Sequence, residues 1–206
     1  AAGLACPRRL TTPEREQAQE ALGRLRPPLV VKVCDAGVAH KSEVGGVRTG
    51  VVDRAGLAAA LDAVAAVPPT GHRRRYLVEE EAPGGVELII GGRRDPSFGP
   101  VVLVGLGGLV AEAVGDVALR LAPVGVADVE EMVAELTGAA VLGGFRGMAP
   151  VDPGEVAGIL GVVSALLTGE GGVEEVDLNP VRATAGGLVV LDALVVGHGA
   201  DPSGVV

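Results

Sequence analysis

The stretch HKSEVGG places His40 and Lys41 shortly before the pair Gly45 and Gly46, directly after an apolar, strand-like run. A neutral imidazole can act as a nucleophile or as a metal ligand, and an ammonium group beside it attracts anions. Glycines let the backbone approach a ligand closely. Taken alone, the stretch fits a phosphate site, a metal ligand or an ordinary turn, and the rest of the chain has to distinguish the three.

Lys32 lies in the middle of the apolar run VVKV. Burying an ammonium group without a partner costs several kcal/mol, so we expect an anionic group to meet it. The alternative is a lysine on an edge strand, where its charge blocks aggregation. Both interpretations stay open on this residue alone.

Oxygen-bearing side chains alternate in the run EVDLNP, where Glu175, Asp177 and Asn179 share one face of an expected strand. Asp192 lies in the expected returning strand and can come opposite them. Carboxylate and amide oxygens suit Mg²⁺, which completes its shell with water and phosphate. The alternative is a solvated sheet face, but the apolar residues around Asp192 favour a metal site.

Two glycine-rich stretches are candidate phosphate contacts. In GLGG, the N–H groups of Gly107 and Gly108 follow a strand and could face phosphate, although Val110 stands where a dinucleotide fingerprint needs a third glycine. In GGFRG, Arg146 could reach an anion across an open loop. The alternatives are a tight turn and a surface arginine.

Composition excludes several classes of protein. The net charge of −9 and the aromatic content of 1% argue against a nucleic-acid partner. His40 has no Cys or His at zinc-ligand spacing, no G-x-S-x-G elbow is present, and the two cysteines lack metal or redox spacing. No apolar run reaches the roughly 18 residues needed to cross a bilayer. We therefore expect a cytoplasmic protein without a membrane partner.

The elements that must position these residues alternate along the chain. Short turns join several neighbouring strands, which only antiparallel pairing allows. The pattern predicts a mixed α/β fold, and not a doubly wound one. Strands are expected at residues 29–33, 47–52, 75–82, 86–92, 100–108, 173–181 and 188–194, and helices at 54–67, 128–137 and 152–167.

Several motifs follow one another in a fixed order: VVKV, HKSEVGGV, LVEEEAPGGVELIIGGRRDPSFGPVVLVGLGG, LRLAP, GGFRG and EVDLNPV. In this order they resemble the ATP-grasp domain of ADP-forming acyl-CoA synthetases, from about Gly3 to Val195. The β subunits of succinyl-CoA synthetases are more distantly similar. The resemblance implies an ATP-grasp fold of mixed α+β sheets, with two lobes that enclose a nucleotide. It further implies an N-terminally truncated small lobe (1–76), a large lobe (77–197) and a flexible tail (198–206).

The resemblance also implies a ligand set of ATP or ADP with Mg²⁺. Lys32 would lie on the phosphate side, and Glu79, Glu80 and Glu81 would lie in the hinge strand near adenine. Glu87 would face the ribose or the phosphates. Asn179 and Asp192 would hold Mg²⁺, with Asp177 nearby. The family usually has Gln where this chain has Glu79, which would place a carboxylate near the base.

The implied function is that of the β portion of an ADP-forming acetate-CoA ligase. His40, with Lys41 beside it, would match the histidine that carries phosphate between the nucleotide and a CoA-binding α subunit. The CoA-binding portion is missing from this sequence, so the chain alone is not expected to make acyl-CoA. Two alternatives stay open: a non-catalytic nucleotide-sensing module associated with an acyltransferase, and a structural fragment of a larger synthetase.

Overall fold

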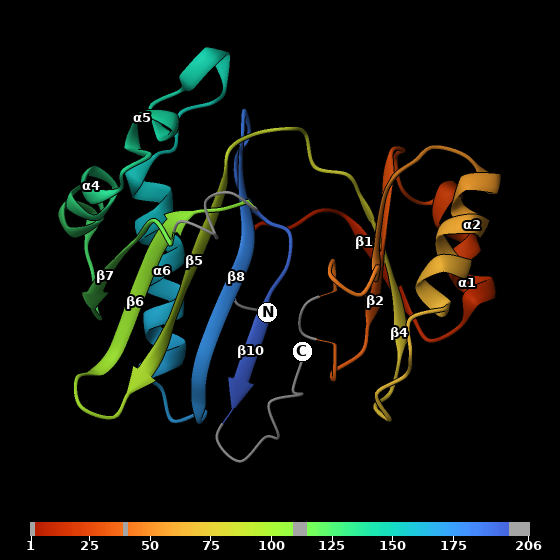
Figure 1. Ribbon diagram of the computed structural model, residues 1–206, viewed down its shortest axis with the longest axis horizontal. Coiled ribbons are helices and arrows are strands. Elements are labelled where there is room, and N and C mark those ends of the chain that lie inside the picture. The colour runs from red at the N-terminus through yellow and green to blue at the C-terminus, as the bar shows by residue number, and fades with distance from the viewer. Residues whose placement is uncertain (1–2, 39–40, 109–114, 198–206) are drawn as a thin grey trace. The chain divides into compact units, whose positions relative to one another are not determined.

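The computed structural model describes residues 3–38, 41–108 and 115–197, and these form two compact units (Figure 1). The small unit contains residues 7–81, and the large unit contains the described residues of 3–6 and 82–197. The expected lobe boundary between residues 76 and 77 falls inside strand β4 (Arg75–Glu80), which pairs with two strands of the small unit.

The small unit is a four-stranded antiparallel sheet with its helices on one face (Figure 1). Its strand order is β1-β4-β2-β3. Strand β2 lies between two neighbours and is buried over nearly its whole length. The bounds are β1 Arg9–Thr12, β2 Leu29–Cys34 and β3 Val47–Val51, with helices α1 Arg15–Gln19, η1 Glu20–Gly23 and α2 Arg54–Ala65.

Helix α2 provides the core of the small unit. Its buried residues Leu57, Leu61 and Val64 pack with alternate residues of β2, so Lys32 belongs to the opposite face of the strand. The side chain of Asp53 accepts a hydrogen bond from the Gly56 N–H (2.7 Å) and caps the N-terminus of the helix. The helix ends before two consecutive prolines, as the sequence predicts.

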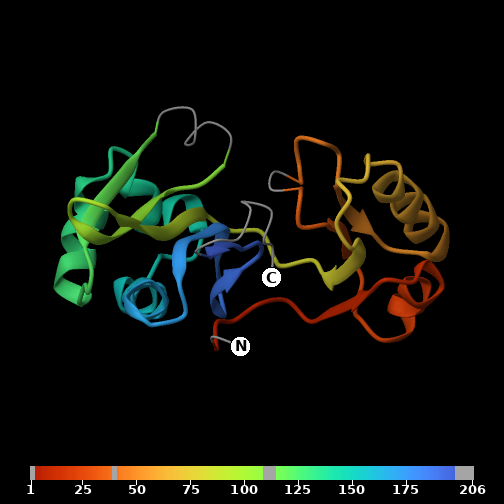
Figure 2. The same ribbon diagram turned by 90° about the horizontal axis from the view of Figure 1, so that it is seen from below.

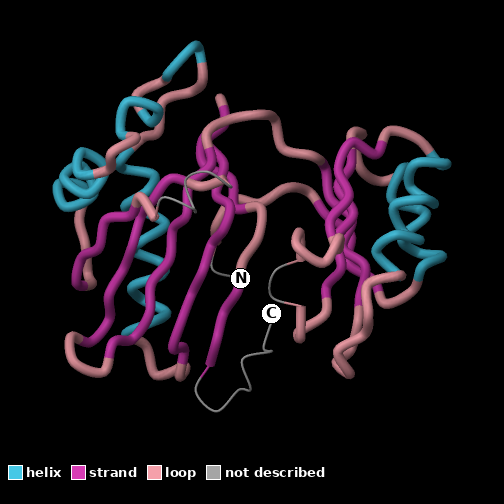
Figure 3. Tube along the Cα trace, in the orientation of Figure 1, coloured by secondary structure: helices cyan, strands magenta, loops and turns pink. Residues whose placement is uncertain are grey.

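The large unit is built on a second antiparallel sheet, drawn in magenta in Figure 3. The strand order is β10-β8-β5-β6-β7, and β9 also pairs with β8. Both sheets are antiparallel, which confirms the predicted mixed α/β fold. The bounds are β5 Glu87–Asp95, β6 Gly99–Leu106, β7 Val117–Leu121, β8 Val173–Thr184, β9 Gly187–Val190 and β10 Leu194–Gly197.

Helix α6 (Pro153–Thr168) covers one face of this sheet, as the nearly end-on view of the helix in Figure 2 shows. Its buried residues Val156, Leu160, Val163 and Leu167 recur every three or four positions, which is the spacing of one helix face. The remaining helices are α4 Val126–Glu135, α5 Ala139–Leu142 and the short η2 Phe145–Gly147. Throughout the described parts of the chain, no helix combines the length and the apolar character needed to cross a membrane.

Candidate functional site

The ammonium group of Lys32 forms an ion pair with the carboxylate of Glu79 on the neighbouring strand β4. Only 8% and 3% of these side chains are exposed. The expectation of an anionic partner for Lys32 is therefore confirmed. The edge-strand alternative is wrong, because β2 is paired on both sides.

The other two carboxylates of the predicted hinge also have partners inside the small unit. Glu80 accepts a hydrogen bond from the Arg26 N–H (3.0 Å) and lies 3.4 Å from a guanidinium nitrogen of Arg8. Glu81 accepts a hydrogen bond from the Gly50 N–H (2.8 Å). These contacts hold Glu80 and Glu81 against the rest of the small unit.

The loop with the sequence HKSEVGG is closed by backbone hydrogen bonds around Gly46. The Gly46 N–H donates to the Lys41 carbonyl (2.7 Å), and the Gly46 carbonyl accepts from the Val33 N–H of β2 (2.8 Å). A Cβ atom at Gly46 would lie 2.5 Å from the Val33 side chain, so the loop approaches the strand more closely than any other residue type allows. Lys41 is buried, with 6% exposure, and His40 lies outside the described residues.

Asp35 ties the start of this loop to the segment that follows α2. Its carboxylate accepts hydrogen bonds from the Gly37 N–H (3.1 Å), the Thr70 hydroxyl and the Arg74 guanidinium (3.2 and 3.3 Å). Burial raises the pKa of Asp35, but the hydrogen bonds from Thr70, Gly37 and Arg74 outweigh it and lower the pKa below its usual value. Asp35 is therefore an ionised anchor at neutral pH.

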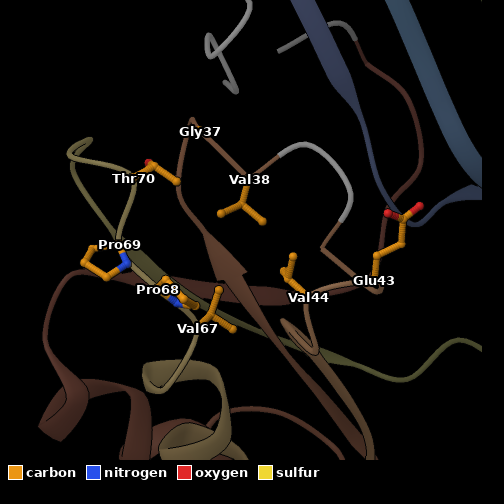
Figure 4. A pocket seen from close by; sticks show the side chains of 8 residues that line it. All are labelled: Gly37, Val38, Glu43, Val44, Val67, Pro68, Pro69 and Thr70. Atoms are coloured by element: carbon orange, nitrogen blue, oxygen red, sulfur yellow. The ribbon is translucent and has the colours of Figure 1, made fainter.

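A cavity of about 450 Å³ lies between this loop and the same segment. Figure 4 shows the side chains of Val38, Val44 and Val67 directed into it, with Gly37 and Thr70 side by side at its edge. The lining is mainly apolar and is completed by Glu43, Pro68 and Pro69. Of the described residues of the loop region, Val38 and Val44 therefore face residues 67–70 across this cavity.

In the large unit, the structure brings Glu87 together with the glycines of GLGG. The Gly107 N–H donates to the Glu87 carbonyl (2.8 Å), and a Cβ atom at Gly108 would lie 3.9 Å from a carboxylate oxygen of Glu87. Gly108 has a φ of +89°, which favours glycine. The Arg182 guanidinium, which the sequence analysis did not select, lies 2.6 Å from the same carboxylate.

The predicted metal ligands of β8 share one face of the strand. Burial alternates along β8, with Val176 and Leu178 in the core, so Asp177 and Asn179 lie on the opposite face and are half-buried. This arrangement confirms the predicted alternation. Among the described residues, no group of three or more His, Cys, Asp and Glu side chains could hold a metal ion. The predicted magnesium ligands differ from such a group, because they combine the amide of Asn179 with the two carboxylates of Asp177 and Asp192.

Asp192 does not lie in a strand, so that part of the prediction was wrong. The expected returning strand is divided into β9 and β10, with residues 191–193 between them. The break lies opposite Pro180, which has no N–H for a continuous ladder. Because the Leu191 N–H donates to the Pro180 carbonyl (2.9 Å) and Leu194 pairs with Asp177, the chain still passes beside this stretch of β8 at Asp192.

Arg146 occupies the short η2 turn of the large unit and is exposed. Its φ of +52° is a left-handed conformation, which is rare for a residue with a side chain. Gly144 and Gly147 on either side also have positive φ values, of +95° and +82°. The turn thus fixes the backbone of Arg146 in an unusual conformation.

Comparison with known proteins adds the family. The sequence model of the ATP-grasp domain matches residues 1–196. The chain belongs to the ATP-grasp family. It is 36% identical over 180 residues to an ADP-forming acetate–CoA ligase I of Archaeoglobus fulgidus, covering 86% of this chain and 26% of that relative. It is 30% identical over 198 residues to the β subunit of ADP-forming acetate–CoA ligase I of Pyrococcus furiosus, covering 94% of this chain and 85% of the subunit.

A solved structure has the same ATP-grasp fold. It is the dinucleotide-forming acetyl-coenzyme A synthetase 1 of Ca. Korarchaeum cryptofilum, in complex with coenzyme A and Mg-AMPPCP and with its phosphohistidine segment pointing towards the nucleotide-binding site. The TM-score is 0.78 at 35% identity, over 96% of this chain and 87% of that one. This ATP-grasp chain thus spans about a quarter of the Archaeoglobus relative and most of the separate Pyrococcus subunit.

Four residues of this ATP-grasp domain were missed by the sequence analysis: Asp35, Thr70, Arg74 and Arg182. Asp35 follows a strand and precedes Ala-Gly, which is a turn signal that indicates a capped turn. Arg74 lies in the only basic cluster, HRRR, but the sequence does not indicate which carboxylate it meets. Both contacts join segments that are more than 30 residues apart.

Proposed function

We propose that this ATP-grasp domain binds Mg-ATP or Mg-ADP and acts as the nucleotide-binding part of an ADP-forming acyl-CoA ligase, of the acetate-CoA ligase type. The observation that carries the proposal concerns its lysines. The chain has only two, Lys32 and Lys41, and both are 6% exposed in the small unit. Lysines are usually exposed, so two buried ones need a specific reason. Binding of phosphate is one such reason, in addition to the internal ion pair that Lys32 forms with Glu79.

In this proposal, both units carry residues that the resemblance assigns to nucleotide binding. From the small unit, Lys32 attracts the phosphates, and the segment Glu79–Glu81 lies near adenine. From the large unit, Glu87 faces the ribose or the phosphates, and Gly108 offers a backbone N–H group at the turn that follows β6. The Gly107 N–H is bonded to the Glu87 carbonyl, so Gly107 serves to hold this turn beside Glu87. Arg146 supplies a further positive charge for an anionic group.

The residues present fit a magnesium ion. Asn179 and Asp192 would hold it, with Asp177 nearby, because half-buried carboxylate and amide oxygens gather at this point of β8. When bound, Mg²⁺ neutralises negative charge on the phosphate oxygens of the nucleotide. The protein residues orient the phosphate chain and keep it beside a fixed positive charge.

His40 would then accept the phosphoryl group. The bond between the γ-phosphorus and the bridging oxygen breaks, a bond from phosphorus to an imidazole nitrogen forms, and ADP leaves with the electron pair. Lys41 offsets the negative charge of the transferred group. The Korarchaeum relative contains a phosphohistidine segment, which supports transfer of phosphate through a histidine in such enzymes. The reverse transfer, to ADP, uses the same groups.

The acyl-CoA chemistry would require a CoA-binding α portion as the partner. The Pyrococcus relative is a β subunit, which supports a division of labour between two chains. Mixing this chain with such an α portion, CoA, acid, ATP and Mg²⁺ should yield acyl-CoA and ADP. Robust CoA ligation by the purified chain alone would contradict the proposed partner.

One observation favours a second candidate, a nucleotide-sensing module associated with an acyltransferase. The carboxylate of Glu79 already neutralises Lys32, so a phosphate group has to compete with an internal anion. Incubation with radiolabelled ATP and Mg²⁺, followed by acid and by base, separates the two candidates. A ligase part should yield an acid-labile, base-stable phosphoenzyme. A sensor should bind the nucleotide and remain unlabelled.

A further inference from the structure

The segment 35–46, which contains the HKSEVGG loop, is fixed to the small unit at both ends. At its far end, Gly46 is bonded to β2 through the Val33 N–H. At its start, the carboxylate of Asp35 receives four hydrogen bonds, from Gly37, Thr70 and twice from Arg74. A carboxylate has about four acceptor sites, so Asp35 has its full complement of partners.

Arg74 is itself held in place, so the contact does not join two mobile side chains. Its guanidinium also donates to the carbonyl groups of Val67 (2.5 Å) and Pro68 (2.8 Å), directly beyond α2. Its side chain is 18% exposed and that of Asp35 is 0% exposed. The pair therefore connects the start of the loop to the end of helix α2.

Gly37 provides the second contact at this end. A Cβ atom at Gly37 would lie 2.4 Å from the Cβ atom of Thr70, so the backbone of Gly37 is as close to the Thr70 side chain as glycine permits. Beyond this point, the cavity of about 450 Å³ separates Val38 and Val44 from Val67 and the prolines. Polar contacts hold both ends of the segment, and Val38 adds an apolar contact with the core of the small unit.

We propose that Asp35 and Arg74 are positioning residues that hold the HKSEVGG loop against the segment 67–74 and so determine how effectively the loop transfers phosphate. The role in transfer rests on the proposed function, whereas the anchoring of the loop does not. Hydrogen bonds to charged groups are among the stronger ones in proteins, and their loss should raise local opening of the loop by at least about tenfold. The apolar core of the small unit does not include this pair.

The lysine content of the chain offers a direct test of the anchoring. Lysyl endopeptidase can cut only after Lys32 and Lys41, and Lys32 lies inside the four-stranded sheet. Loosening the loop should therefore accelerate cleavage after Lys41, which yields fragments 1–41 and 42–206, before any cleavage after Lys32. Asp35→Asn and Arg74→Met should each accelerate this cut about tenfold or more under native conditions.

Asp62→Asn is the matched control. It removes another ion pair of the small unit, in which the Asp62 carboxylate lies 2.8 Å from the Arg15 guanidinium, and it should leave cleavage after Lys41 within about twofold of wild type. The double variant Asp35→Asn/Arg74→Met should be no faster than the faster single variant, because both changes remove one interaction. Fully additive effects would show that the two residues act separately and would overturn the proposal.

A milder pair of variants covers the case in which Asp35→Asn does not fold. Thr70→Ser keeps the hydroxyl that donates to Asp35, and Thr70→Val removes it with little change of shape. Thr70→Val should accelerate the cut after Lys41, and Thr70→Ser should restore the wild-type rate. Equal rates for wild type, Thr70→Val and Thr70→Ser would overturn the anchoring.

The effect on transfer is measured separately from nucleotide binding. In Asp35→Asn, the rate of phosphoenzyme formation from Mg-ATP should fall about tenfold or more, while the Mg-ATP dissociation constant stays within about threefold of wild type. Equal losses of affinity and rate would reduce Asp35 to a general structural role and overturn the positioning role. If the wild type forms no phosphoenzyme, the proposed function fails, and the cleavage rates still decide whether Asp35 anchors the loop.

Discussion

Lys32 on β2 and Glu79 on β4 form an ion pair in which 8% and 3% of the two side chains are exposed. Removing one member of a buried pair leaves an uncompensated charge, and this costs about 3–5 kcal/mol. A bound phosphate group can supply the missing negative charge to Lys32. Under the proposed function, the pair links the stability of the small unit to nucleotide binding.

Glu79→Gln is expected to destabilise the free protein by up to about 3–5 kcal/mol and to increase the stabilisation by Mg-ATP. The ammonium group of Lys32 then loses its ion pair with Glu79, and the negative charge of the phosphates can replace it. The measurement is the free energy of unfolding in urea, with and without saturating Mg-ATP. A smaller Mg-ATP effect in Glu79→Gln than in wild type would contradict the prediction.

Lys32→Met provides the complementary variant. It leaves the Glu79 carboxylate buried without its cation and removes the positive charge that phosphate needs. We expect a loss of stability of about the same size, together with no measurable stabilisation by Mg-ATP. Stabilisation equal to wild type would show that Lys32 does not face the phosphates.

Asn179→Ala and Asp192→Ala should each abolish Mg-dependent ATP binding while the fold is retained. Oxygen ligands that face a triphosphate repel it unless a cation lies between them. Calorimetry with and without Mg²⁺ measures the effect, and circular dichroism checks the fold. Glu130→Gln, on the exposed side of α4, serves as the control and should bind as wild type does. Unchanged Mg-dependent affinity in both alanine variants would remove these residues from the metal site.

Much of the fold follows from local patterns in the sequence. Four elements were predicted within one or two residues, because apolar periodicity and proline or glycine boundaries mark them. They are the strands Leu29–Cys34 and Val47–Val51 and the helices Arg54–Ala65 and Pro153–Thr168. Strand β1 and helix α1 were missed. Both are short, and β1 is only intermittently apolar. Its strand conformation depends on pairing with β4, which is distant in the sequence.

The candidate site was less predictable, because its contacts join distant parts of the chain. The need of Lys32 for an anion follows from its apolar neighbours, but the sequence cannot select Glu79 over the next two glutamates. Asp192 was placed in a strand because the pattern around it is apolar, and the missing N–H of Pro180 on the partner strand interrupts that ladder. The side-chain partners of Asp35 lie in the segment that leads from helix α2 back to the sheet, and local sequence patterns do not predict the path of that segment.

Gly46→Ala is expected to destabilise the small unit by about 1–3 kcal/mol, because a Cβ atom there would lie 2.5 Å from Val33 and 2.9 Å from the Lys41 carbonyl. Gly23→Ala is the control, since no atom lies within 4 Å of a Cβ atom at that position. Its free energy of unfolding should stay within about 0.5 kcal/mol of wild type. Denaturant unfolding of both variants tests the prediction, and equal effects would contradict it.

Acid should weaken the anchor at Asp35. Its pKa in the folded protein is lower than its ordinary value of 3.8, because hydrogen bonds from Thr70, Gly37 and Arg74 outweigh the effect of burial. The stabilisation is therefore present above pH 3.8 and is lost as the pH falls through the lower, folded-state pKa. Asp35→Asn should be less stable at neutral pH and should lose less stability than wild type below that pH. Parallel curves of unfolding free energy against pH would contradict this assignment.

His40→Asn tests the phosphate transfer at the residue that would carry it. Asparagine lacks a nucleophilic ring nitrogen, whereas an imidazole with an ordinary pKa of about 6.5 is mostly neutral at pH 7 and has a free lone pair. The variant should keep its affinity for Mg-ATP, lose the acid-labile, base-stable phosphoenzyme, and form no acyl-CoA with a CoA-binding partner. His72→Asn is the matched control, because His72 lies outside every proposed contact, and it should keep the label. A His40→Asn variant that retains both label and turnover would show that HKSEVGG is an ordinary turn and that the phosphate passes elsewhere.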